Sequence, residues 1–260
     1  MRSSVRSVMQ LLDTERRPVE QLFLRDLKRS IELTANKSGR KPSQTYKPSS
    51  LNCIRNMYYQ VIGVEQDPGE SSYISVGICN SGSDIHVRVQ TAVDDMKNNG
   101  IDCEYVDVAD FVTSRNLDYL TIVAKQGMET KLYHKDLNMS FLTDGIIRYK
   151  GKYYIIEFKT ETSRKFYQRN AVDEKHHNQA IAYSIAFGIE NVLFVYISRD
   201  TLDMKAFMYP VSSEMRHGLI NKIKECDGYV KKKQTPPKPD TNGGKLCDYC
   251  AYQKTCERED

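Results

Sequence analysis

The segment TDGIIRYKGKYYIIEFKT, residues Thr143–Thr160, carries the strongest structural signal in this chain. Apolar runs flank Lys150-Gly151, and this pattern predicts two β-strands joined by a two-residue turn. With that turn, Tyr149 pairs with Lys152, and the same register continues along the hairpin. The sequence therefore predicts an antiparallel hairpin whose cross-strand neighbours are fixed.

The predicted hairpin brings two acids and an amine to one place. Its register puts Asp144 directly opposite Glu157, with Cβ atoms about 5 Å apart. Lys159 follows Glu157 by two residues, so both side chains point to the same face. Neighbouring carboxylates repel unless a cation lies between them, and hard divalent cations bind carboxylate oxygens. We interpret the pair as a metal site; the alternative is a surface hairpin that carries a Glu–Lys pair without function.

The composition is that of a globular protein of 260 residues, with 40% hydrophobic and 28% charged residues. This length can bury a substantial core, and we expect one α/β domain with appendages. No apolar run is long enough for a membrane span or a secretory signal, so we expect a cytoplasmic protein that does not enter a membrane. Residues 1–60 hold 12 Lys+Arg against 5 Asp+Glu, which is compatible with a polyanionic partner or with a solvated basic face.

Hydrophobic periodicity predicts the order of the elements. Helices are expected over 15–34, 53–61, 82–98, 165–188 and 212–233, and strands over 119–126, 191–198 and 205–211. A polar Gly/Pro-containing linker over 36–50 separates the first helix from the rest. Strands, hairpin and helices in this order predict a mixed sheet flanked by helices.

Three cysteines near the end of the chain form a C-x2-C-x5-C pattern. C-x2-C is the usual ligand pair for zinc or for an iron–sulfur cluster. Three ligands leave a four-coordinate site one short, and Cys53 is the candidate that completes Cys247, Cys250 and Cys256. Such a link would close a very long loop, worth about 5 kcal/mol in chain entropy. The alternative is a tail of reduced cysteines without a ligand.

Taken together, these residues resemble the PD-(D/E)XK nuclease superfamily in its RecB-like form. The resemblance rests on Asp144, Glu157-Phe158-Lys159, Gln179-x3-Tyr183, Gly82-x3-His86 and Glu129. The four cysteines are similar to the iron–sulfur staple of AddB and of the CRISPR-associated RecB-like exonucleases (the fourth Cas family) and their phage relatives. The resemblance extends from about Ser49 to Cys256. Thr143 replaces the proline that names the superfamily, and Ile54 replaces a proline that commonly follows the first cysteine.

The resemblance implies a fold and a division of the chain. The fold is a restriction-endonuclease-like mixed β-sheet flanked by helices, with a helical N-terminal extension and a C-terminal four-Cys subdomain. Residues 1–48 would form a basic arm and linker, and residues 49–260 the nuclease domain.

The resemblance also implies a metal-dependent DNA exonuclease acting on single-stranded DNA or DNA ends, in recombination and repair, phage DNA processing or CRISPR-like adaptation. It implies Mg²⁺ or Mn²⁺ bound by His86, Asp144, Glu157 and the Phe158 carbonyl, supported by Glu129. Lys159 would orient water or offset charge on phosphorus, and Gln179 and Tyr183 would contact the strand. The four cysteines would hold a [4Fe–4S] cluster, with zinc as the alternative.

The sequence also fits a second hypothesis of function. The chain would then be a catalytically weak DNA-binding or processing subunit of a larger recombination or spacer-acquisition complex. Recombination or CRISPR adaptation proteins would be its partners beside DNA, and an oligomer is compatible with either reading.

Overall fold

A computed structural model describes residues 18–36, 42–67, 69, 71–239, 247–248 and 250–259 of the chain. The chain divides into two compact units, Met1–Arg40 with Pro68–Ser81, and Lys41–Asp67 with Gly82–Asp260. The predicted arm and linker over residues 1–48 stays a prediction, since residues 1–17 and 37–41 lie outside the described residues. Among the described helices, none combines the length and apolarity needed to cross a bilayer.

The first unit contains α2 (Val19–Asn36), which was predicted over 15–34, and the start of α4 (Tyr73–Asp94). Glu32 accepts a hydrogen bond from the Tyr73 backbone N–H at 3.0 Å, and Lys28 Nζ lies 4.6 Å from the centroid of the Tyr73 ring. Helix α4 begins nine residues before the predicted start at Gly82. Its later residues, from Gly82 onward, belong to the second unit.

The predicted hairpin forms β5 (Gly145–Tyr149) and β6 (Lys152–Glu161) in the second unit. Tyr149 pairs with Lys152, and the ladder runs without a shift to Gly145 and Ile156, which confirms the predicted register. Lys150 and Gly151 both have positive φ, 48° and 75°, as a type I′ turn requires.

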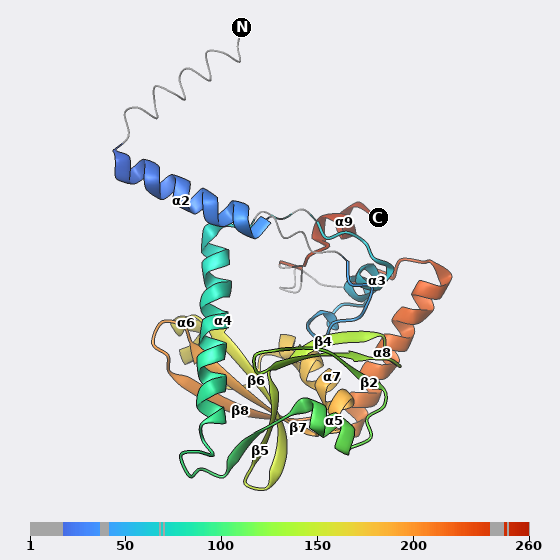
Figure 1. Ribbon diagram of the computed structural model, residues 1–260. Coiled ribbons are helices and arrows are strands. Elements are labelled where there is room, and N and C mark those ends of the chain that lie inside the picture. Colours follow the sequence, from blue (N-terminus) through green and yellow to red (C-terminus); the bar gives the residue numbers. More distant parts are fainter. Residues whose placement is uncertain are drawn as a thin grey trace. The chain divides into compact units, whose positions relative to one another are not determined.

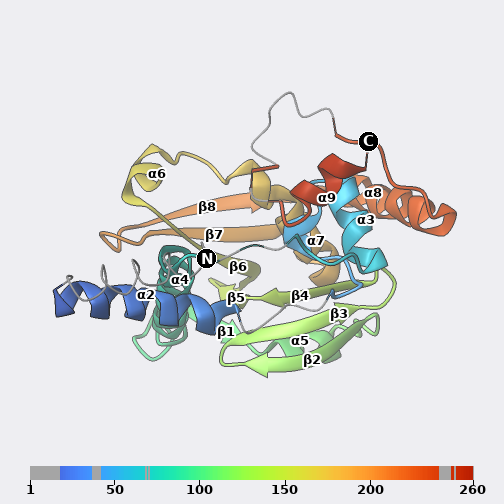
Figure 2. The same cartoon turned by 90° about the horizontal axis from the view of Figure 1, so that it is seen from above.

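The main sheet of the described chain has the order β1-β5-β6-β7-β8. Figure 1 labels β5, β6, β7 and β8, and Figure 2 also labels β1. Strands β1 (Cys103–Val106), β7 (Asn191–Ser198) and β8 (Met204–Pro210) join the hairpin. Strand β7 runs parallel to β6, and the other pairs are antiparallel. The mixed sheet flanked by helices confirms the predicted α/β fold class and is consistent with a restriction-endonuclease-like arrangement.

A smaller sheet precedes the hairpin and was predicted only at its first strand. It consists of β2 (Leu120–Gln126), β3 (Glu129–His134) and β4 (Met139–Thr143), which lie side by side in Figure 2. Strand β4 ends at Thr143 and β5 begins at Gly145, so the chain passes from one sheet to the other at a single residue, Asp144.

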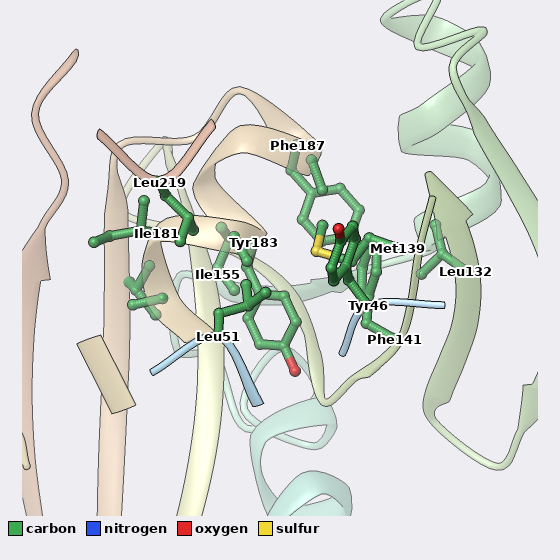
Figure 3. Packing of buried hydrophobic residues seen from close by; sticks show 14 of the residues in the cluster. Tyr46, Leu51, Leu132, Met139, Phe141, Ile155, Ile181, Tyr183, Phe187 and Leu219 are labelled. Atoms are coloured by element: carbon green, nitrogen blue, oxygen red, sulfur yellow. The ribbon is translucent and has the colours of Figure 1, made fainter. Parts of the chain in front are cut away.

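Hydrophobic side chains cover both faces of the main sheet. Ile155 on β6 belongs to the larger core, with residues of α7 (His177–Phe187), α8 (Ser213–Lys232) and the small sheet. Figure 3 shows part of this core, in which Tyr183 and Phe187 of α7 point toward Phe141 of β4. Alternate residues of β6, Ile156 and Phe158, pack instead with Ile85 of α4. Strand periodicity therefore directs Glu157 and Lys159 to the α7 face.

The helix predicted over 165–188 is wrong in its first half. The structure has a short α6 (Ser163–Gln168), an irregular segment, a 3-10 turn at Glu174–His176 and then α7. The buried Arg169 guanidinium binds both carboxylate oxygens of Glu161, at 2.6 and 2.7 Å, and its backbone is extended. This buried ion pair holds the chain out of the helix that the local pattern favours. The predicted end at Gly188 is confirmed, because Gly188 caps α7 with φ 66°.

The remaining helices of the second unit follow the predictions closely. Helix α3 (Ile54–Ile62) begins directly after Cys53, and α8 begins after Ser212, whose hydroxyl accepts a bond from the Met215 N–H at 3.3 Å. The described elements also include α5 (Val108–Ser114) and α9 (Gln253–Arg258).

Candidate functional site

Asp144 lies at the joint between the two sheets. The last pair of the β3–β4 ladder is Thr130 with Thr143, and the first pair of the β5–β6 ladder is Gly145 with Ile156. Extending each ladder by one residue places Asp144 opposite Glu129 on one side and opposite Glu157 on the other. One carboxylate therefore meets acids from two sheets.

Two acids and an imidazole form a compact group at this joint. Ligand atoms of His86, Glu129 and Asp144 all lie within 4.8 Å of one another. His86 Nδ1 is 3.7 Å from Asp144 Oδ1. Burial by itself lowers the pKa of His86, but the neighbouring Asp144 outweighs it and the pKa is raised. Burial, and then the charge of Asp144, raise the pKa of Glu129. Carboxylate oxygens with an imidazole suit a divalent cation such as Mn²⁺.

Glu157 is buried beside this group and has one satisfied and one unsatisfied oxygen. Its Oε1 accepts hydrogen bonds from Lys159 Nζ at 2.6 Å and from Gln179 Nε2 at 2.8 Å. Its Oε2 is buried and has no hydrogen-bond partner among the described residues. Burial raises the pKa of Glu157. Leaving a buried carboxylate oxygen unpaired is costly, so this atom fits a cation ligand.

The residues predicted on α7 are tied to the same network. Gln179 Oε1 accepts from Lys159 Nζ at 3.0 Å, and Gln179 Nε2 lies 2.9 Å from the Tyr183 hydroxyl. The Tyr183 hydroxyl donates to the Leu142 carbonyl at 2.9 Å. Both α7 side chains are buried, and these contacts are internal. Their predicted contact with a bound strand stays a prediction.

Phe158 contributes to the site through its backbone. Its N–H donates to Asp144 Oδ2 at 2.7 Å, while its ring packs edge-on to His86 at 6.0 Å between centroids. This bond occupies one Asp144 oxygen and leaves Oδ1 on the side of His86. The predicted role of the Phe158 carbonyl as a ligand stays a prediction.

The approach of α4 to β6 places His86. A Cβ on Gly82 would lie 3.1 Å from Thr160 Oγ1, so glycine lets the helix approach the strand closely. His86 is one turn further along the same helix.

Two residues that sequence reasoning missed contact the backbone of Asp144. The Tyr105 hydroxyl and the Gln90 amide both donate to the Asp144 carbonyl, at 3.0 and 3.4 Å. Gln90 follows His86 by four residues on α4, so helical spacing offered a signal. Tyr105 comes from a separate strand, β1, and had none.

The four predicted cysteines line a single cavity between α3 and the C-terminal segment. Asn56 Nδ2 donates to Cys250 Sγ at 3.5 Å. Burial raises the pKa of Cys250 and of Cys256, and the nearby Cys53 and Cys247 raise both further. Four cysteines that line one cavity offer the thiolate ligands that a bound cation or cluster needs.

The segment that carries the last cysteines has further anchors. The Tyr59 hydroxyl donates to Glu259 at 2.6 Å, and the side chain of Asp67 accepts from the Lys254 and Thr255 backbones at 2.6 and 3.1 Å. These bonds hold the C-terminal segment against the beginning of the domain without any contribution from sulfur.

Comparisons with known proteins gave structures but no sequence family. No protein-family model and no curated protein sequence matches the chain. SSO0001 is similar over 90% of this chain and 96% of that chain, with 18% identity and a TM-score of 0.45. The alkaline exonuclease LHK-Exo from Laribacter hongkongensis is similar over 74% of this chain and 90% of its own, with 9% identity and a TM-score of 0.45. The structure of LHK-Exo in complex with dAMP is similar over 73% of this chain and 89% of its own, with 9% identity and a TM-score of 0.46.

Proposed function

We propose that the chain is a divalent-metal-dependent deoxyribonuclease that hydrolyses phosphodiester bonds at DNA ends. The observation that carries the proposal is the unpartnered, buried Oε2 of Glu157 beside the His86–Glu129–Asp144 group. A fold that buries this oxygen without a donor is stabilised when a cation binds it. The order of motifs along the sequence, which resembles end-processing nucleases, supports the choice of DNA ends.

The residues have separate tasks in this proposal. His86, Glu129, Asp144 and Glu157 would hold Mg²⁺ or Mn²⁺, which when bound supplies Lewis acidity toward the scissile phosphate and the attacking water. Lys159 holds an ammonium beside the Glu157 carboxylate, where its charge offsets negative charge that develops on the phosphate oxygens. Lys159 is itself fixed by Gln179, so its position is set before substrate arrives.

The cavity with the four cysteines would hold a structural [4Fe–4S] cluster. The four cysteines line one cavity, and their pattern, which resembles that of iron–sulfur exonucleases, supports the cluster over zinc. Iron and sulfide analysis after anaerobic purification tests this: stoichiometric zinc in a colourless protein contradicts it.

The test of the activity is a time course on end-labelled linear DNA, single- and double-stranded, with Mg²⁺ and with Mn²⁺. Wild type should release short products from one end, and Asp144→Asn should reduce the rate at least about 100-fold. Asp136→Asn, an exposed acid in the β3–β4 turn, is the matched control and should cleave like wild type. Equal cleavage of circular single-stranded DNA would contradict action at ends.

Undiminished cleavage by Asp144→Asn would contradict the site itself. Metal-dependent cleavage that appears only after a recombination or adaptation protein is added would favour the processing-subunit reading. Which of the recombination, phage or CRISPR-like settings applies stays a prediction.

A further inference from the structure

Asp144 is held by contacts outside both strand ladders, and the role that we assign to these contacts rests on the proposed function. Asp144 belongs to neither ladder, so strand pairing does not fix its peptide group. Two side chains take over that task. The Tyr105 hydroxyl and the Gln90 amide converge on its carbonyl oxygen, at 3.0 and 3.4 Å, and Gln90 is only 2% exposed.

The residue after Asp144 is shaped to receive the Tyr105 ring. Gly145 has φ +149°, and a Cβ added there would overlap the ring of Tyr105. Any other residue at position 145 would be strained at this φ and would clash with the Tyr105 ring. The ring is seated against the same peptide whose carbonyl its hydroxyl binds.

The carboxylate of Asp144 is restrained at its other end. Oδ2 accepts the Phe158 N–H at 2.7 Å, and Oδ1 is left toward His86. The carbonyl is held by two donors and one carboxylate oxygen by a third, so both the main chain and the side chain of Asp144 are restrained. Loss of the carbonyl donors would free the Cα atom from which the carboxylate projects, and with it the position of Oδ1.

Helix α4 contributes twice to this arrangement. His86 and Gln90 are four residues apart and lie on one face of the helix. His86 belongs to the metal-binding group, and Gln90 donates a hydrogen bond to the backbone carbonyl of Asp144, a second member of that group. The helix therefore sets the position of the imidazole and of the Asp144 peptide together.

We propose that Tyr105 and Gln90 form a clamp on the Asp144 carbonyl and are positioning residues for the divalent metal site. They touch neither metal nor substrate, and they act by fixing the Oδ1 atom that Asp144 offers. Outer-shell partners of this kind typically change metal affinity or activity about 10–100-fold when removed.

The experiment uses the full chain and Mn²⁺ as the probe. Mn²⁺ binding is followed by electron paramagnetic resonance, with cleavage of end-labelled DNA measured in parallel. Tyr105→Phe keeps the ring in its seat and removes only the hydroxyl, and Gln90→Met keeps the volume and removes the amide. Tyr133→Phe is the matched control, because the Tyr133 hydroxyl binds Asn138 in the small sheet.

Tyr105→Phe and Gln90→Met should each weaken Mn²⁺ binding about 10-fold, with kcat falling more than KM rises. The double variant should lose more Mn²⁺ affinity than either single variant, because each single variant keeps one of the two donors to the Asp144 carbonyl. Tyr133→Phe should bind Mn²⁺ like wild type, and all three single variants should melt at similar temperatures.

The outcomes separate this inference from the proposed function. Wild-type Mn²⁺ affinity in Tyr105→Phe, or a double variant no weaker than Tyr105→Phe alone, overturns the clamp while leaving the nuclease intact. If the wild-type protein cleaves no DNA but both clamp variants lose Mn²⁺ binding, the clamp is supported and the proposed nuclease activity is contradicted. Absence of Mn²⁺ binding in wild type overturns the clamp.

Discussion

Lys159 Nζ lies 2.6 Å from Glu157 Oε1, two residues away on the same face of β6. Lys159 Nζ also donates a hydrogen bond to Gln179, so two side chains of the protein hold the lysine in place. The pair is nearly out of solvent, with the side chain of Glu157 5% exposed and that of Lys159 22%. An ion pair in this setting is held in one geometry, which is what a site built for electrostatic stabilisation requires.

Lys159→Met should lower kcat at least about 100-fold, because it removes the charge that would stabilise the scissile phosphate. DNA affinity, measured by fluorescence anisotropy with Ca²⁺ in place of Mg²⁺, should change much less. Lys152→Met, on the exposed end of the same strand, is the control. A loss of affinity as large as the loss of rate would show that Lys159 binds rather than catalyses.

Gln179→Leu should lower kcat about 10–100-fold and leave KM for DNA nearly unchanged, because Gln179 contacts Glu157 and Lys159 rather than solvent. Steady-state kinetics on short linear DNA measures the split between the two constants. An increase in KM with unchanged kcat would instead support the predicted direct contact of Gln179 with the strand.

Arg169→Met should cost about 3–5 kcal/mol in the free energy of unfolding, because it leaves the Glu161 carboxylate buried without its partner. Urea unfolding measures the loss. The matched control is Arg148→Met, whose pair with Glu104 is exposed and should be worth about 0–1 kcal/mol. Adding Glu161→Met to Arg169→Met should recover much of the stability; no recovery would mean that the pair is not the cause.

His176→Gln should make the fold less sensitive to acid. Burial, and then the charges of Lys159 and Lys175, lower the pKa of His176 to about 2. The unfolded state, with a histidine pKa near 6.5, therefore binds the proton first, and stability falls as pH drops below that value.

The slope from this one group is at most about 1.4 kcal/mol per pH unit. Urea unfolding at pH 7 and pH 5 should show a smaller loss for His176→Gln than for wild type. His217→Gln, on the exposed side of α8, is the control and should lose as much as wild type. Equal losses in wild type and His176→Gln would contradict the buried neutral imidazole.

Cys250→Ser should lower the melting temperature and the iron content together, because one of four cavity sulfurs is lost. Cys79→Ser is the matched control, since Cys79 is exposed and lies in the first unit. Iron analysis and calorimetry of both variants decide the matter. A Cys250→Ser protein that folds and melts like wild type would contradict the staple.

Local patterns were sufficient where neighbours in sequence are also neighbours in space. The register from Tyr149 and Lys152 follows from a two-residue turn and strict alternation, so the pairing beside Asp144 and Glu157 was predictable. The same holds for β7 and for the start of α8, because an apolar run and a serine cap are local signals.

Long-range packing decided what local patterns could not. The break before α7 exists because Arg169 binds Glu161, whose position depends on the sheet rather than on the helix pattern. Tyr105 reaches the Asp144 carbonyl only because β1 pairs with β5, and nothing near residue 105 in the sequence indicates that pairing.

Local sequence was enough to predict the hairpin and its register, and it supplied the candidate acids, lysine and cysteines. The position of Asp144 between two sheets, where it meets Glu129 and Glu157 at once, came from the folded chain. Side-chain period and turn geometry act over a few residues, whereas the meeting of two ladders depends on how separate segments share one buried core.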